Sequence, residues 1–362
     1  MSAVQQYDIT PVLEKLIRKE NLSLEEAQTV ADHLANGELS QVQITAFLVL
    51  LRAKGESGEE LLAMAQAMRR RATIPDPLPS SLSSLAPLVD IVGTGGDGHD
   101  TVNLSTASAI VASACGARVA KHGNRSASSK SGSADVLEAL GVPMLDAFCV
   151  GECIDRAGIA FLFAPNFHPA MGPVAPLRKQ LGIKTVFNIL GPLLNPLEPK
   201  RMVLGVYAPH LLPIYAQAVS GLGVEHALIV HCCGLDELAS VGIAEAVEIK
   251  GTSTRTMQID SQEFCAGPYG TIADLKGGDA AHNAQVLRVL LGGGGGVELK
   301  ACFDTICLNA GAVLFVSGLA KTMKDGVNMA AEAMKTSRAL RKLEELAKVA
   351  QDLHGRVKKV KV

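Results

Sequence analysis

The sequence has no tryptophan and few aromatic or charged residues, and this composition excludes two broad classes of protein. Phe, Tyr and Trp make up 4% of its 362 residues and charged residues 19%, whereas 48% are hydrophobic. Disordered chains and coiled coils carry more charge and fewer apolar residues, so we expect a soluble globular protein. A formal net charge of −2 provides no general positive field for nucleic acid or an anionic membrane. Any anion must therefore be bound at a local site.

The sequence also lacks the marks of a disulfide framework, a zinc site or an exported chain. Its eight cysteines are scattered, with Cys232 and Cys233 adjacent and no C-x-x-C pair. A chain of this length needs no disulfide staples, so we expect reduced thiols. The N-terminal MSAVQQYDIT has no basic segment followed by an apolar one, and no apolar stretch approaches about 18 residues without a polar interruption. We expect a cytoplasmic protein with no membrane span.

A chain of 362 residues is longer than one compact core usually organises, so we expect two domains. From about Thr10 to Ala72 the sequence predicts a small bundle of helices, the first of which starts at Thr10-Pro11 with proline at its first position. Three further starts are capping boxes, in which a serine is followed three residues later by Glu or Gln. These capping boxes begin at Ser23, Ser40 and Ser57.

After this bundle, PDPLPSSLSS at residues 75–84 cannot continue a helix and predicts a linker. Short apolar runs, several with a helical stretch between them, then predict a mostly parallel sheet covered on both faces. These predicted strands are Leu88–Val92, Ala117–Ala120, Ile159–Phe163, Met202–Val206 and Ala227–His231. The expected fold class is therefore α/β, with a small N-terminal helical domain over residues 1–85 and a large α/β domain over 86–362.

Other segments predict helices and irregular structure. His168–Leu197 contains helices and Pro-rich turns that either return to the helical domain or bridge two strands, and periodicity does not decide between these. The glycines at 292–296 predict a flexible loop, and the basic end HGRVKKVKV predicts a solvated tail. The C-terminal helices are expected over Asp304–Gly318, Asp325–Met334 and Ser337–Gln351.

The loop after the first predicted strand, GTGGDGHDTVNLSTASAI, contains a G-x-G-x-x-G match that starts at Gly93. The match favours a dinucleotide site only weakly, because such a turn leads straight into its helix and needs an acidic residue at the end of the next strand. Here the next strand ends in Lys121 and His122. The glycines instead allow backbone N–H groups to converge on a phosphate, with Ser105 and Thr106 adding hydroxyls at a helix N-terminus. A tight strand-to-helix turn is the alternative.

Two further loops predict chemistry at the same edge of the sheet. KHGNRSASSKSGSADVLEALG, residues 121–141, places basic side chains and hydroxyls before a helix, which favours a polyanion site over a plain basic surface loop. Loops at the carboxyl ends of parallel strands line one crevice, so both loops predict one shared site. VHCCGLDELAS places Asp236 and Glu237 after another strand. Such a pair is often surface charge, but beside a phosphate site it typically holds Mg²⁺.

Four motifs together resemble those of the anthranilate phosphoribosyltransferases of tryptophan biosynthesis, in order and in separation: GTGGDGHDTVNLSTASAI, KHGNRSASSKSGSADVLEALG, FNILGPLLNP and GLDELAS. The resemblance covers nearly the whole chain. It implies transfer of the 5-phosphoribosyl group from phosphoribosyl pyrophosphate (PRPP) to anthranilate, which gives N-(5-phosphoribosyl)anthranilate and pyrophosphate. It also implies that residues 168–200 join the helical domain, that two Mg²⁺ ions are bound, and that a homodimer forms through the helical part.

The resemblance further implies which residues bind PRPP and metal. Ser105 would ligate one Mg²⁺ ion bound to the pyrophosphate, and Asp236 and Glu237 would hold the second. The residues implied to contact PRPP are Gly93, Gly96, Asp97, Thr101, Asn103, Leu104, Ser105, Thr106, Lys121, His122, Gly123, Asn124, Arg125, Ser126, Ala127, Ser128, Ser129 and Ser133.

The same resemblance implies the anthranilate site. The residues expected to face anthranilate are Gly93, Asn124 and Arg178, with His122 a weaker candidate for the same approach. The planar guanidinium of Arg178 matches a carboxylate bidentately. Because the amine of anthranilate is already an adequate nucleophile, we assign no general base. Magnesium and the basic loop would stabilise the charge of the departing pyrophosphate.

Two departures and two alternatives stand beside this resemblance. One departure is the run of glycines at 292–296, which is atypical of the family. Family members commonly have glycine where Cys232 follows the histidine of VHCCGLDE, so the turn that aims the acidic pair is expected to differ. Pyrimidine nucleoside phosphorylases share the fold and the glycine loop, but generally neither KHGN nor the magnesium pair. A catalytically idle homologue that binds nucleic acid is disfavoured by the mild net charge and the intact Asp-Glu pair.

Overall fold

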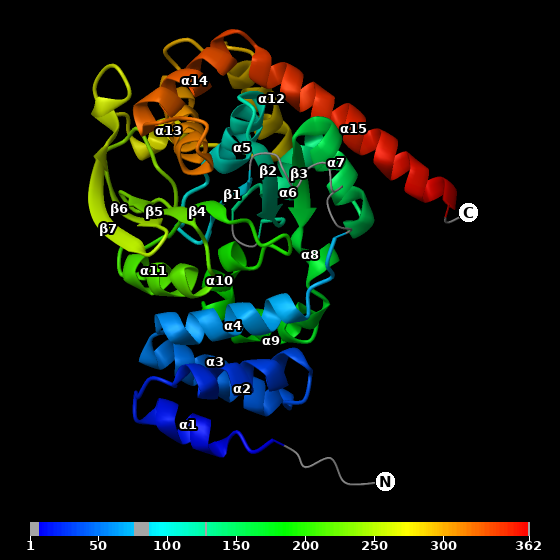
Figure 1. Ribbon diagram of the computed structural model, residues 1–362, viewed down its shortest axis with the longest axis vertical. Helices are drawn as coiled ribbons and strands as arrows, with labels where there is room; N and C mark the ends of the chain where they lie inside the picture. Colours follow the sequence, from blue (N-terminus) through cyan, green and yellow to red (C-terminus); the bar gives the residue numbers. More distant parts are fainter. Residues whose placement is uncertain (1–6, 76–86, 127–128, 361–362) are drawn as a thin grey trace.

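The computed structural model describes residues 7–75, 87–126 and 129–360. Four helices near the N-terminus stack below a larger part built on a sheet (Figure 1). They are α1 (Thr10–Ile17), α2 (Leu24–Ala35), α3 (Gln41–Lys54) and α4 (Gly58–Arg70). The predicted capping boxes at Ser23, Ser40 and Ser57 are all present, and each satisfies two free N–H groups at its helix start. In α1, Pro11 is the second helical residue rather than the first.

The sheet has seven strands in the order β3-β2-β1-β4-β5-β6-β7. The first five in this order run parallel, and β6 and β7 are antiparallel. Their bounds are β1 (Leu88–Gly93), β2 (Arg118–Gly123), β3 (Ile159–Phe163), β4 (Arg201–Gly205), β5 (His226–Cys232), β6 (Ile243–Lys250) and β7 (Ser253–Asp260). The predicted α/β fold class and its five parallel strands are confirmed, whereas β6 and β7 were not predicted.

Helices cover both faces of the sheet (Figure 1). On one face the core includes α5, α7 and the C-terminal helices, and on the other it includes α11 and continues into α1–α4. The helices after β1 are α5 (Leu104–Ala114), α6 (Ser133–Ala139), α7 (Val150–Ala157), α8 (Ala164–Phe167), α9 (Val174–Leu181), α10 (Val186–Leu190), α11 (Leu211–Gly221), α12 (Ala280–Leu291), α13 (Lys300–Ser317), α14 (Met323–Lys335) and α15 (Arg338–Val360).

The segment from His168 to Leu197 returns to the N-terminal helices. Helix α9 contacts α3, and α10 contacts both α3 and α4. Val174, Leu177 and Phe187 are buried in the same core as the apolar faces of those helices. This excursion places α9 and α10 between the helical bundle and the carboxyl ends of the central strands, where the candidate site lies.

The C-terminal end differs from the prediction of a solvated tail. Helix α15 continues to Val360 instead of ending near Gln351. Leu353 is buried in the core, and Arg356 pairs with Glu152 of α7 at 3.0 Å, which holds the helix end in place. Helix α12 was not predicted. The glycines that follow it form its turn into α13, and three of them, at 293, 295 and 296, have positive φ.

The linker prediction is not tested by the structure, and α13 is a long apolar helix. The predicted linker at 75–84 lies outside the described residues except for Pro75. Within the described part, α13 is the one helix long and apolar enough to cross a membrane, and 72% of it is buried inside the protein. A buried core helix passes the same test, so this is weak evidence for a span.

Candidate active site

A cavity of about 930 Å³ opens at the carboxyl ends of β1 and β2 and is also lined by residues of α9 and α10. Strand order reverses between β1 and β4, and a reversal of this kind opens a crevice at the ends of parallel strands. All predicted site residues that the structure describes line this cavity except Thr106, which is buried and donates a hydrogen bond to Ser133 at 3.1 Å. Ala127 and Ser128 lie outside the described residues.

Asp236 packs against two glycines at the point where the strand order reverses between β1 and β4. Gly93 ends β1 and is paired in register with Gly205, which ends β4. A Cβ at Gly93 would lie 2.0 Å from Asp236 Oδ2, and a Cβ at Gly205 would lie 1.5 Å from the Asp236 carbonyl oxygen. The backbone N–H of Gly95 donates to Asp236 Oδ2 at 2.6 Å. The missing side chains of both glycines therefore create the space that the acidic residue fills.

Asp236 and Glu237 are buried close to other carboxylates, which disfavours their charged forms. Burial, with the nearby charge of Asp97, raises the pKa of Asp236 to about 6. Burial raises the pKa of Glu237 well above its usual value, and Asp236 adds to this. Glu237 Oε2 is buried and has no hydrogen-bond partner. A cation beside these oxygens would stabilise the charged forms of both carboxylates, so the donor set fits a hard divalent metal ion.

Cys232 lies just before the turn that carries this pair. It is the last residue of β5 and pairs with Ala244 of β6. The left-handed positions fall on the next two residues, Cys233 at φ 52° and Gly234 at φ 92°. Cys232 itself therefore needs no left-handed backbone, and the expected difference from the family's turn stays a prediction. All eight cysteines lie in the described residues and none is joined to another by a disulfide, as predicted.

Ser105 and Lys121 lie close to the carboxylates of Asp236 and Glu237. The Ser105 backbone N–H donates to Glu237, and Lys121 Nζ lies 3.4 Å from Ser105 Oγ. Lys121 is 3% exposed and also donates to the Ile91 carbonyl at 2.7 Å. Burial lowers its pKa, while the carboxylates of Asp90 and Glu237 oppose that effect. The site thus holds a buried cation close to its acidic residues.

Two buried histidines face each other at the cavity wall. His122 Nε2 and His168 Nε2 are 3.2 Å apart, so one ring donates and the other accepts. Burial lowers the pKa of His122 to about 3 and that of His168 to about 4. Both rings are therefore neutral at pH 7 and are weak bases. His168 lines the cavity but was not predicted as a site residue, because nothing in its sequence context distinguishes it.

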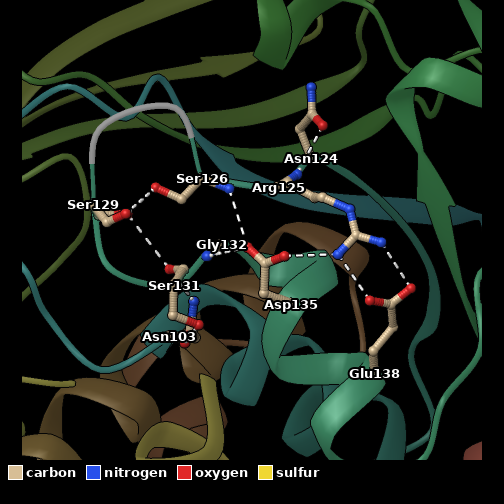
Figure 2. A network of polar contacts seen from close by, with 9 residues as sticks. All are labelled: Asn103, Asn124, Arg125, Ser126, Ser129, Ser131, Gly132, Asp135 and Glu138. Atoms are coloured by element: carbon tan, nitrogen blue, oxygen red, sulfur yellow. Dashed lines mark hydrogen bonds and ion pairs between the residues drawn. The ribbon is translucent and has the colours of Figure 1, made fainter. Parts of the chain in front are cut away.

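The basic loop is held by a dense polar network (Figure 2). Asn103, at the start of α5, donates to the Ser131 carbonyl at 3.1 Å and accepts from Asn283 of α12 at 2.9 Å. Ser126 and Ser129 are joined through their hydroxyls at 2.8 Å. This network links the glycine loop, the basic loop and α12, so the two loops predicted to share a site are physically connected.

Two cations reach the cavity from the α9–α10 segment. Arg178 lies with its guanidinium carbon 5.6 Å from the centre of the Phe187 ring, and burial lowers its pKa. No carboxylate in the described part of the chain pairs with it. Lys184 donates to the Gly96 carbonyl at 2.5 Å and lies 4.1 Å from the centre of the Tyr207 ring. Lys184 was not predicted, since no local motif marks it and only the return of α9 brings it to the glycine loop.

Comparisons with known proteins cover nearly the whole chain. A model described as the α/β domain of a glycosyl transferase family matches residues 85–340, and one for the helical bundle domain of such a family matches residues 10–72. A curated anthranilate phosphoribosyltransferase from Parvibaculum lavamentivorans is 44% identical over 342 residues, which are 94% of this chain and 96% of the relative.

Solved structures agree with these matches. A crystal structure of anthranilate phosphoribosyltransferase from Thermus thermophilus is 42% identical, with a TM-score of 0.85, and covers 94% of this chain and 99% of its own. The Saccharomyces cerevisiae enzyme in complex with PRPP and Mg is 30% identical, with a TM-score of 0.84 and coverage of 95% and 98%. A further structure of that yeast protein holds 4-fluoroanthranilate.

Proposed function

The chain belongs to the anthranilate phosphoribosyltransferases, and we propose that its cavity is where PRPP and anthranilate are brought together. The enzyme transfers the 5-phosphoribosyl group from PRPP to anthranilate, a reaction of tryptophan biosynthesis that releases pyrophosphate. One observation carries the assignment of the cavity. It holds both an acidic pair with an unpartnered oxygen, Glu237 Oε2, and the guanidinium of Arg178, which pairs with no carboxylate among the described residues.

For PRPP, we propose contacts from three groups of residues that meet at the cavity. The glycine loop offers Gly93, Gly96, Asp97 and Thr101, and the start of α5 offers residues 103–106 with the favourable end of its dipole. The basic loop, residues 121–129 with Ser133, completes the set. The support is the convergence of those that the structure describes around one cavity, with Thr106 contributing through its hydrogen bond to Ser133.

For the metal, we propose two Mg²⁺ ions. Asp236 and Glu237 would hold one, and Ser105 would be a ligand of the other together with pyrophosphate oxygens. The support is the penalty that burial imposes on these carboxylates and the unpartnered Glu237 Oε2. When bound, the ions would supply positive charge to stabilise the departing pyrophosphate.

For anthranilate, we propose that Arg178 binds the carboxylate and that Asn124 and Gly93 border the ring and amine. The amine nitrogen forms a bond to the anomeric carbon of the ribose while the bond from that carbon to pyrophosphate breaks, and the electron pair leaves with pyrophosphate. The proton that the amine then loses passes to water or to the departing pyrophosphate. Because His122 and His168 are neutral, weak bases, the residues of the cavity act mainly by positioning and by charge.

At the level of the whole molecule, we propose a helical domain over 1–85 joined by 168–200, an α/β domain over 86–362, a cytoplasmic location and a homodimer. The dimer would form through the helical part. Ile17 and Val42 of that part are 56% and 79% exposed, and large apolar side chains of this kind suit a protein interface.

The test follows anthranilate fluorescence after addition of PRPP and Mg²⁺ to the purified protein, with each component omitted in turn. We expect the signal to fall only in the complete mixture. Arg178→Ala and the double variant Asp236→Ala with Glu237→Ala should both be impaired, the first for anthranilate and the second for Mg²⁺. Binding of PRPP without any consumption of anthranilate would refute the acceptor site, and a protein stabilised by phosphate and a nucleoside would favour a phosphorylase.

A further inference from the structure

The guanidinium of Arg125 in the basic loop pairs with two carboxylates, those of Asp135 and Glu138 (Figure 2). Its Nη1 donates to Asp135 Oδ1 at 2.7 Å and to Glu138 Oε2 at 2.8 Å, and its Nη2 donates to Glu138 Oε1 at 2.8 Å. Its carbon also lies 5.4 Å from the centre of the Phe163 ring. Figure 2 shows Arg125 turned toward α6, whereas Asn124 points away from that helix.

The charges around Arg125 do not suit direct binding of pyrophosphate. Two carboxylates already face one guanidinium, so a further anion at that position would meet net negative charge. Bidentate pairing also fixes the planar fork in the geometry that a phosphate would otherwise use. Arg178, by contrast, has no carboxylate partner in the described part of the chain.

Asp135 ties the two ends of the basic loop together. Besides Arg125, its carboxylate accepts from the backbone N–H of Gly132 at 2.9 Å and of Ser126 at 3.2 Å. The loop ends approach so closely that a Cβ at Gly132 would lie 2.2 Å from the Ser126 nitrogen. The next residue back, Ser131, accepts from Asn103 at the start of α5. The ion pairs are thus connected to both phosphate-binding loops.

We propose that Arg125, Asp135 and Glu138 are positioning residues that hold the basic loop in its PRPP-binding shape, and that the Arg125 side chain does not bind pyrophosphate itself. This inference rests on the proposed PRPP site. It revises the role of one residue in that site, since Arg125 then contributes through the loop backbone and through its partners.

Loss of the Glu138 carboxylate should change the KM for PRPP differently if Arg125 positions the loop than if it binds pyrophosphate. If Arg125 positions the loop, Glu138→Gln and Arg125→Gln both raise the KM for PRPP, by about three- to tenfold for a partly exposed network. The KM for PRPP of the double variant should be no higher than that of the single variant with the higher KM, because both changes break the same ion pair. If Arg125 binds pyrophosphate, Glu138→Gln frees its guanidinium, so the KM for PRPP falls or stays unchanged.

The experiment measures kcat and the KM for PRPP and for anthranilate in wild type, Arg125→Gln, Glu138→Gln and the double variant. We expect the KM for PRPP to rise while the KM for anthranilate stays within twofold of wild type. Arg156→Gln is the matched control, because Arg156 also pairs with two carboxylates, Glu152 at 3.0 Å and Asp352 at 2.7 Å, and it does not line the cavity. Its kinetics should equal those of wild type.

A KM for PRPP that is unchanged or lower in Glu138→Gln would overturn the proposal. Thermal unfolding checks that each variant folds, and Arg125→Lys, which keeps the charge but loses the fork, replaces Arg125→Gln if the latter does not. Different results would refute the proposed function and the positioning role. A wild type that consumes no anthranilate refutes the proposed function, whereas an active wild type with unchanged variants refutes only the positioning role.

Discussion

Replacement of Gly93 by alanine tests the packing of Asp236 against the end of β1. The backbone of Gly93 is not left-handed, so alanine adds no conformational strain there. Its Cβ would, however, lie 2.0 Å from Asp236 Oδ2 and 2.9 Å from the Asp236 carbonyl oxygen. Cβ atoms do not approach other atoms within 3.0 Å, so the carboxylate must retreat by about 1 Å or more.

The magnitude follows from the hydrogen bond that Asp236 makes. A retreat of this size is enough to break the 2.6 Å bond from the Gly95 N–H, and a hydrogen bond to a charged group contributes about 1.5–3 kcal/mol. If that energy holds Asp236 in position for the metal, Mg²⁺ affinity should fall by about 10- to 100-fold. The side chain can rotate away, so the protein should still fold.

The assay is the rate of anthranilate consumption at saturating PRPP over a series of Mg²⁺ concentrations. We expect Gly93→Ala to need about 10- to 100-fold more Mg²⁺ for half-maximal rate. Gly355→Ala in α15 is the control, because nothing lies within 4 Å of the added Cβ. It should leave the Mg²⁺ curve unchanged and stabilise the helix by about 0.5–1 kcal/mol. A wild-type Mg²⁺ curve for Gly93→Ala would refute the reasoning.

Three other changes test other parts of the account. Arg178→Lys should raise the KM for anthranilate by about tenfold without changing the KM for PRPP, because an ammonium lacks the planar fork; equal KM values for anthranilate would contradict the carboxylate site. Asn195→Ala should lower the free energy of unfolding by about 3 kcal/mol in urea titrations, because it removes buried hydrogen bonds to Asp90 at 2.9 Å and to the Ala120 carbonyl at 2.8 Å. The third concerns pH. Burial lowers the pKa of His168 to about 4, so below pH about 6.5 the unfolded chain binds a proton that the folded protein does not. Stability should therefore fall between pH 6.5 and 4, by about 3 kcal/mol from this residue at pH 4. His168→Gln should make the decline shallower, while the part from His122 remains. A slope unchanged in His168→Gln would show that the ring titrates normally.

Local signals in the sequence predicted much of the fold. The three serine capping boxes depend only on residues three apart, and all three form. The parallel strands are continuous apolar runs because both of their faces are covered. β7 fails this test because most of its residues are exposed, which leaves a polar sequence without a strand pattern. The end of α15 was missed because Gly355 and several lysines resemble a tail, while the contacts that hold it come from α7.

The candidate site was predictable where it consists of loops and not where it depends on tertiary contacts. The glycine and basic loops carry their chemistry in contiguous motifs, and their residues converge on one cavity. Lys184 and His168 reach that cavity only because α9 and α10 return to the N-terminal helices. The ion pairs of Arg125 likewise depend on how α6 lies beside the loop. From the sequence alone, Arg125 was therefore predicted to bind PRPP.

The central claim is that one cavity joins the ribose of PRPP to anthranilate and releases pyrophosphate. The most direct test measures anthranilate consumption and pyrophosphate release in the same reaction, with Mg²⁺ present. The account predicts that one pyrophosphate appears for each anthranilate consumed, and that both signals vanish together when Asp236 and Glu237 are replaced by alanine. Pyrophosphate release without loss of anthranilate, or loss of anthranilate that does not require PRPP, would contradict it.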